Sequence, residues 1–188
     1  MRNGSFSTKI RRNYLSEVVI QIQNFCQYKK IKKKIMFLAA VTLGYHDYKI
    51  GIFTFEGTVN SKVYCNIIKK IKQKLATLNK RQKHFILVHD RAKPHVSNFT
   101  RNFINNIGWD IVLQPPCSPD LNPLDVGIWN SMEHRLKFKR KNTKNSLQRA
   151  VVDTWNNLPP ESVKSTIELI KQNCIEIEKL GGVNYYKD

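Results

Sequence analysis

The segment QPPCSPDLNP, residues 114–123, constrains the fold more than any other part of this sequence, because four of its ten residues are proline. Proline has no amide hydrogen to give to a helix or a central strand, so this segment must form a stiff, irregular turn. It follows DIVL, 110–113, a short apolar run that predicts a buried strand. Apolar residues then recur at helical spacing and predict a helix that begins at Asp125 or Val126.

Three other apolar runs have the length of strands. IMFLAAVTL, 35–43, and YKIGIFTFEG, 48–57, are separated by a short polar turn, which predicts an antiparallel hairpin. FILV, 85–88, is continuously apolar, which is typical of a strand covered on both faces of its sheet.

The period of the apolar residues changes to that of a helix in several places. One helix is expected from Asn60 to Leu75, with lysines on its outer side, and a shorter one from Ser97 to Gly108. Two more are expected near the C-terminus, the second of them starting at Pro160 and ending at Gly181 and Gly182. Residues 14–26 favour a helix, although the β-branched residues between Val18 and Ile22 also suit a strand. This order of elements predicts a mixed α/β sheet flanked by helices.

The net charge indicates the kind of partner. Thirty-two basic residues against 14 acidic ones give +18, which points to a polyanion and most simply to nucleic acid. A basic balance also occurs in ribosomal or mitochondrial proteins, and that alternative stays open. The segment YKKIKKK, 28–34, and the segment KFKRKNTK, 137–144, concentrate the positive charge. The residues that we expect to contact phosphates are Lys29, Lys30, Lys32, Lys33, Lys34, Arg91, Lys93, Lys137, Lys139, Arg140 and Lys141.

Other classes of protein are disfavoured. The four cysteines are scattered without a C-x-x-C pair, so we expect reduced thiols and no zinc knuckle. No apolar run approaches the roughly 18 residues that span a bilayer, so we expect no membrane association. The start of the chain carries no acidic residue before Glu17, as in a mitochondrial presequence, but basic arms of nucleic-acid-binding proteins have the same composition.

Two carboxylates follow neighbouring predicted strands. Asp90 follows the strand at 85–88 after a single residue, His89, and Asp125 follows the strand at 110–113 and its proline-rich turn. There are 34 residues between the two aspartates. Reactive groups of open α/β sheets gather at the carboxyl ends of the strands, so these side chains can converge. Two carboxylates among basic residues suit a magnesium site that acts on phosphodiesters. Alternatively, Asp125 caps the following helix and Asp90 is a solvated strand end.

The motifs HDRAKPH, 89–95, and PPCSPDLNPLDVGIW, 115–129, resemble the catalytic domain of the mariner family of DNA transposases. The second acidic residue of that family lies in an H-D-N-A-x-P-H segment and the third lies just after S-P-D-L-N-P. Asp90 and Asp125 reproduce the separation found in the insect-type branch. Weaker similarity extends from Ile35 through FEGTVNSKVY to WNNLPPESV and IEKLGGVNYY.

The resemblance implies a ribonuclease H-like fold and a two-metal mechanism in which Asp90 and Asp125 are catalytic residues that bind Mg²⁺ or Mn²⁺. It implies duplex DNA as partner (transposon ends and target), possible homodimers, no small-molecule substrate, and a location in the nucleus. His89, Pro94 and His95 would shape the loop beside Asp90. We expect a basic N-terminal segment with a helix at 1–34, a catalytic core at 35–145, and C-terminal helices packed on it at 146–188.

The sequence departs from the family in three respects. The first of the family's three carboxylates belongs on a strand just before Ile35, where Glu17 is the only acidic residue. That first strand is therefore expected to be missing or replaced. Arg91 stands where the family has asparagine and puts a cation beside the supposed metal. The chain also has little room for helix-turn-helix modules. We therefore expect a degenerate or truncated transposase, inactive as given, or else a non-catalytic DNA-binding protein derived from one.

Overall fold

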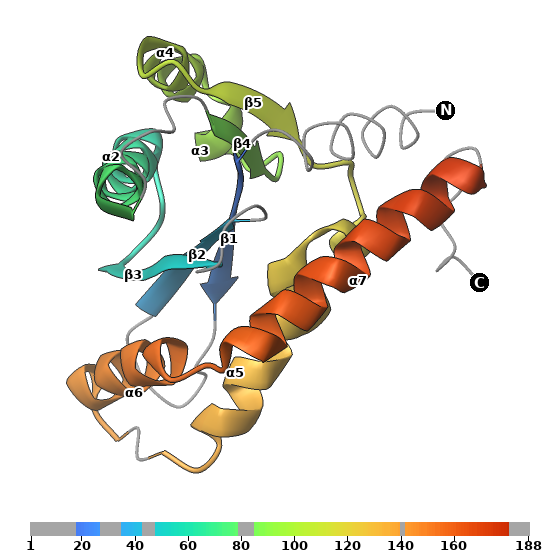
Figure 1. The fold of residues 1–188 in the computed structure, drawn as a ribbon. Coiled ribbons are helices and arrows are strands. Elements are labelled where there is room, and N and C mark those ends of the chain that lie inside the picture. The colour runs from blue at the N-terminus through green and yellow to red at the C-terminus, as the bar shows by residue number, and fades with distance from the viewer. Residues whose placement is uncertain (1–17, 27–34, 43–47, 79–84, 140–141, 181–188) are drawn as a thin grey trace.

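A five-stranded mixed sheet forms the centre of the structure, with helices on both of its faces (Figure 1). The computed structural model describes residues 18–26, 35–42, 48–78, 85–139 and 142–180. The expected end of the last helix at Gly181 and Gly182 lies outside these residues. Within them, no helix is both long enough and apolar enough to cross a bilayer.

The strands are arranged in the order β3-β2-β1-β4-β5. β2 (Ile35–Thr42) and β3 (Lys49–Glu56) form the expected antiparallel hairpin. β1 (Val18–Cys26) pairs antiparallel with β2 and parallel with β4 (Phe85–His89). β5 (Asp110–Leu113) lies parallel to β4 at the edge. The mixed α/β architecture is therefore confirmed.

The helix expected over residues 14–26 is wrong for the part that the structure describes. Residues 18–26 form the central strand β1, so the first strand is present, although we expected it to be missing or replaced. Its position explains the difference, because a central strand gains a ladder of hydrogen bonds on each side and β-branched residues fit a buried pleated surface. Ile20 of β1 is fully buried.

One face of the sheet is covered by α2 (Ser61–Leu78) and α4 (Asn98–Asn106). The short α3 (Lys93–Val96) connects β4 to α4. Leu38, Ala40 and Leu87 of the sheet pack there against Tyr64, Ile68 and Ile71 of α2. α2 begins where predicted, because the Asn60 Oδ1 accepts the Val63 amide at 2.9 Å. Ser97 caps α4 in the same way, and Gly108 follows it with a φ of 76°.

The other face is covered by three helices, of which α7 is the longest (Figure 1). They are α5 (Trp129–Leu136), α6 (Lys144–Asn156) and α7 (Pro160–Lys179). Phe37, Val88 and Val112 of the sheet share a core with Trp155 and Ile167 on this side. The sheet thus separates two apolar layers, and the boundaries predicted at residues 34 and 145 remain predictions.

Candidate catalytic edge of the sheet

Asp90 lies where the buried strand β4 leaves the sheet. All five residues of β4 are buried, because β1 and β5 flank the strand and helices cover both of its faces. Asp90 follows at once, and its side chain is 41% exposed. The carboxyl end of a parallel strand in the middle of an α/β sheet is the usual place for a reactive group.

Two hydrogen bonds hold one oxygen of this carboxylate. The amide of Ala92 donates to Asp90 Oδ1 at 2.9 Å, and His95 Nδ1 lies 2.6 Å from the same oxygen. His95 is itself completely buried, so its ring cannot turn away into solvent. In the described part of the chain, no residue bonds the second oxygen, Oδ2. The arrangement therefore fixes the rotamer of Asp90 and leaves one oxygen for a ligand.

The surroundings keep Asp90 ionised. Partial burial by itself raises the pKa of the carboxyl group, but the hydrogen bond and positive field of His95 and the Ala92 amide outweigh it. The net result is a pKa below the ordinary value of an aspartate. A deprotonated carboxylate at neutral pH is the form that binds a divalent cation.

Three stacked rings support the loop that follows Asp90. His95 lies on Tyr64 of α2 with ring centroids 4.0 Å apart, and His89 lies 5.4 Å from His95 on nearly parallel planes. The Tyr64 hydroxyl bonds to His89 Nδ1 at 2.8 Å. These contacts agree with the expected role of His89 and His95 in shaping the loop. Tyr64 falls among the apolar positions of the helix predicted from Asn60 to Leu75, and no signal in that helical pattern distinguishes this second role.

His89 is a neutral imidazole in this stack. Burial is the main cause that lowers its pKa to about 3, assisted by the nearby charges of His95 and Arg101 and opposed by Asp90. Its buried Nε2 has no hydrogen-bond partner in the described chain. The ring therefore acts as a rigid support, because a charge at this position is strongly disfavoured.

The proline-rich turn is tied to the end of β4 by hydrogen bonds. The backbone N–H of Gln114 donates to the His89 carbonyl at 2.9 Å, and the side-chain Nε2 of Gln114 donates to the Ser118 carbonyl at 2.6 Å. Cys117 adopts a positive φ of 53°, the strained position of a tight turn. Asn173 of α7 donates to the Asp120 carbonyl at 2.8 Å. The turn is thus held both by β4 and by α7.

Asp125 lies in the first turn of the helical segment that follows. The helix starts at Leu124, one residue before the predicted start, as a π-helical turn over Leu124–Ile128 that continues into α5. The buried Asn122 organises this turn, because its Oδ1 accepts the Leu124 amide and its Nδ2 donates to Asp125 Oδ2 at 3.2 Å. Pro123, and not Asp125, occupies the N-cap, so the alternative in which Asp125 caps this helix is wrong.

The carboxylates of Asp90 and Asp125 are the type of ligand that a hard divalent cation prefers, but they are too few to form a complete site. Carboxylate oxygens such as those of Asp90 and Asp125 are the ligands that Mg²⁺ and Mn²⁺ prefer. However, no group of three or more His, Cys, Asp or Glu side chains within the described ranges is arranged so that it could hold a metal ion. β1, which runs beside β4, has the sequence VVIQIQNFC and contributes no acidic residue. The convergence of Asp90 and Asp125 on one ion stays a prediction.

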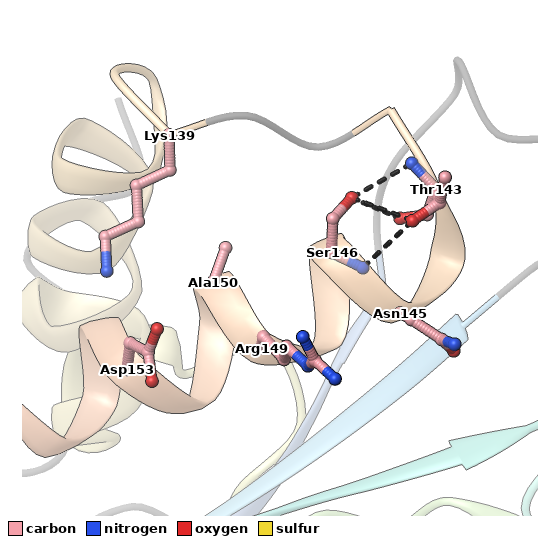
Figure 2. A pocket seen from close by; sticks show the side chains of 7 residues that line it. All are labelled: Lys139, Thr143, Asn145, Ser146, Arg149, Ala150 and Asp153. Carbon is pink, nitrogen blue, oxygen red and sulfur yellow. Dashed lines mark hydrogen bonds between the residues drawn. The ribbon is translucent and has the colours of Figure 1, made fainter.

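The expected phosphate-binding residues fall into three groups. Arg91 and Lys93 are exposed directly beside Asp90. Lys137 is exposed after α5, and Lys139 lines a pocket between the end of α5 and the start of α6 (Figure 2). The remaining predicted contacts lie outside the described residues: Lys29, Lys30, Lys32, Lys33, Lys34, Arg140 and Lys141.

The pocket beside Lys139 is polar and mixed in charge. Figure 2 shows the Lys139 side chain extending toward the side of α6 that carries Asp153, with Arg149 on the same helix. Thr143 and Ser146 form a reciprocal capping box at the start of α6. Because both hydroxyls are occupied by this cap, Lys139 and Arg149 are the charged donors that this pocket offers to an anion.

The mixed sheet covered by helices on both faces has the fold of a ribonuclease H-like domain. The crystal structure of the catalytic domain of Mos1 mariner transposase aligns with a TM-score of 0.83 at 18% identity, covering 98% of this chain and 94% of that one. The chain belongs to the DDE superfamily endonuclease family, whose sequence model matches residues 23–148. The resemblance to transposase catalytic domains is therefore confirmed.

Curated relatives agree with this assignment. The chain is 30% identical over 146 residues to the Tc3 transposase of Caenorhabditis elegans, covering 73% of this chain and 42% of that protein. It is also 30% identical over 125 residues to the human histone-lysine N-methyltransferase SETMAR, covering 65% of this chain and 18% of that protein. The chain thus spans less than half the length of these relatives. The Mos1 catalytic domain has been solved with Raltegravir and Mg or Mn.

Proposed function

We propose that this chain is a transposase-derived domain that binds duplex DNA at the edge marked by Asp90, with an incomplete metal site for strand cleavage and transfer. The observation that carries the proposal is the carboxylate of Asp90. It is partly exposed, ionised, and fixed through one oxygen, at the end of a central parallel strand. A solvated, purely structural aspartate has no need of a buried histidine that fixes its orientation.

Asp90 and Asp125 are the residues that would hold Mg²⁺ or Mn²⁺. Such an ion, when bound, neutralises charge that develops on the phosphodiester and activates the attacking oxygen. His95 and Asn122 keep the two carboxylates in place, since each donates to one of them. Arg91 and Lys93 lie beside Asp90 and would hold the DNA backbone.

The first of the three carboxylates that the family uses has no counterpart on β1. In the parallel pairing of β1 with β4, Ile22 is level with His89, so Gln23 is the next position and is level with Asp90. An amide at that position binds a divalent cation much more weakly than a carboxylate does, because it carries no charge. We therefore expect cleavage by this chain to be slow or absent while DNA binding remains.

Several broader features rest on the relatives. Mos1 forms paired-end complexes with transposon ends, which supports duplex DNA as the partner of this chain and supports a homodimer. A nuclear location follows from a DNA substrate of this kind. The alternative function is that of a non-catalytic DNA-binding protein, and the absence of an acidic residue in β1 favours it.

Nicking of supercoiled plasmid in Mg²⁺ or Mn²⁺ separates the two functions. If the metal site works, Asp90→Asn and Asp125→Asn abolish nicking. Asp120→Asn, which changes a carboxylate on the same turn, leaves it intact. Nicking that survives both of the first two changes contradicts the assignment of the site. Wild-type protein that binds duplex in a salt-sensitive way but never nicks supports the alternative.

A gain of function tests the missing carboxylate. Gln23→Asp supplies an acidic group at the β1 position level with Asp90, so it should raise the nicking rate above wild type. The double variant Gln23→Asp/Asp90→Asn should lose that gain. If Gln23→Asp is folded by circular dichroism and still no more active than the wild type, then Gln23 does not stand in the place of the missing ligand.

A further inference from the structure

Positive charge is divided unequally between the two faces of the sheet. The described residues 57–78 and 85–109, which contain α2, α3, β4 and α4, hold eight lysines and arginines and one acidic residue, Asp90. The described residues 110–139 and 142–179, which contain β5 and all the helices of the other face, hold eight basic and nine acidic residues. The α5–α7 side can therefore neutralise its own charge, whereas the α2 and α4 side cannot.

The outer side of α2 is a continuous polar stripe. Lys62, Asn66, Lys69, Lys70 and Gln73 recur at three- and four-residue spacing and are all exposed, opposite the buried residues of the helix. Lys72 and Lys74 donate to the backbone carbonyls of Ile107 and Ile50.

Three of these lysines have nothing to neutralise them. In the described chain, Lys62, Lys69 and Lys70 make neither a hydrogen bond nor an ion pair. Lys62 and Lys69 lie two turns apart, which is about 10 Å along the helix axis. A row of unpaired ammonium groups on a rigid helix can therefore take up an extended anion without breaking any existing contact.

α4 extends this stripe sideways. Ser97, which caps α4, donates from Oγ to Ser61 Oγ at 2.9 Å, and Cys65 of α2 lies 3.7 Å from Thr100 Oγ1 of α4. The two helices thus form one layer on the same side of the sheet (Figure 1). The exposed side chains of α4 include one cation and several amides, which are Asn98, Arg101, Asn102 and Asn105.

We propose that these exposed residues of α2 and α4, the α2/α4 face, bind the phosphate backbone of duplex DNA without reading its sequence. Lysine, arginine, asparagine and glutamine are the side chains that contact phosphate and sugar oxygens. α2 is about 27 Å long, and duplex DNA carries one charge per about 1.7 Å of its axis, so several phosphates lie within reach. This inference rests on the proposed function only in taking DNA as the partner. It adds a second contact surface, made by residues that lie outside the Asp90 loop.

The test compares matched pairs of lysines. Lys69→Gln/Lys70→Gln removes two charges from the α2/α4 face, and Lys164→Gln/Lys179→Gln removes two exposed charges from α7. Fluorescence anisotropy of a labelled random duplex gives the binding constant of the full chain from about 50 to 200 mM salt, where each phosphate contact contributes a slope of about −0.9. Glutamine preserves helix propensity, and circular dichroism checks the fold.

The α2 pair should lower the magnitude of the slope by about 1.8, which reduces the salt-induced loss of affinity about 12-fold over this range, and the α7 pair should leave it unchanged. Equal slopes for both pairs overturn the inference while leaving the proposed function standing. The same measurement with labelled polyglutamate tests an acidic protein as the partner. If the α2 pair loses binding to polyglutamate while its binding to DNA is unchanged, the inference is overturned and an acidic protein partner is indicated. Wild-type protein that binds no duplex refutes both the inference and the proposed function.

Discussion

Gly127 and Thr166 provide the sharpest test of how the segment bearing Asp125 is packed. Gly127 lies in the π-helical turn two residues after Asp125, against α7. A Cβ atom at this position would lie 2.7 Å from Thr166 Oγ1 and 3.3 Å from Thr166 Cγ2. Thr166 has little freedom to move, because it is β-branched and nearly buried and its hydroxyl donates to the Ser162 carbonyl at 2.9 Å.

The expected free energies follow from this contact. Overpacking a core costs about 1–3 kcal/mol, while alanine in a helix is favoured over glycine by about 1 kcal/mol. Gly127→Ala should therefore destabilise the wild type by up to about 2 kcal/mol. In a Thr166→Ala background the clash is absent, so the same change should be neutral or stabilising by up to about 1 kcal/mol. The coupling energy is then about 1–3 kcal/mol.

Urea unfolding of the four proteins, followed by circular dichroism, measures this coupling. A control pair is Gly51→Ala with Lys74→Ala. There the added Cβ would lie 2.9 Å from the flexible end of Lys74 and in ordinary contact with Phe53 Cζ at 3.4 Å, so coupling should be weak. If Gly127→Ala has the same effect with and without Thr166→Ala, the contact between the π-helical turn and α7 is not as described. Slower nicking in Gly127→Ala alone would connect this packing to Asp125.

Three further outcomes are expected. Lys49→Met should destabilise the fold by about 1–3 kcal/mol in urea unfolding. Lys49 Nζ donates to the carbonyls of Trp155, Asn156 and Leu158 at 2.9–3.1 Å, at the end of α6, and unchanged stability would contradict a role for these bonds. A thiol reagent at pH 8, with the products mapped by mass spectrometry, should modify the exposed Cys117 at once. Burial raises the pKa of the Cys174 thiol to about 12, so Cys174 should react only on unfolding. Finally, the pKa of His89 is about 3 in the folded protein and 6.5 in the unfolded chain. The unfolded chain therefore binds more protons below pH 6.5, and the free energy of unfolding should fall by about 2 kcal/mol between pH 6.5 and pH 5. A His89→Phe variant should lack this share of the slope, and an identical slope in both proteins would rule out a neutral, buried His89.

Local signals in the sequence were sufficient for most elements. DIVL is β5, the hairpin lies where its apolar runs predict it, and α4 begins after Ser97 as its cap requires. The four prolines after β5 exclude regular structure, and the turn is indeed irregular apart from a short 3₁₀ segment at Pro119–Leu121. These features depend only on the residues themselves and on their near neighbours in the sequence, so they can be predicted from the sequence.

The tertiary structure alone decided the features that involve distant partners. Residues 18–26 suit both a helix and a strand, and they became β1 because β2 and β4 offer hydrogen bonds on both sides. The contact of His95 with Asp90 lies within one motif, but the ring of Tyr64 that supports it comes from α2, 31 positions before His95. Long-range pairing of this kind depends on how the helices and strands pack, so it cannot be predicted from local sequence patterns. The sequence thus determined which carboxylates the chain has, and the packing determined which of their atoms are held.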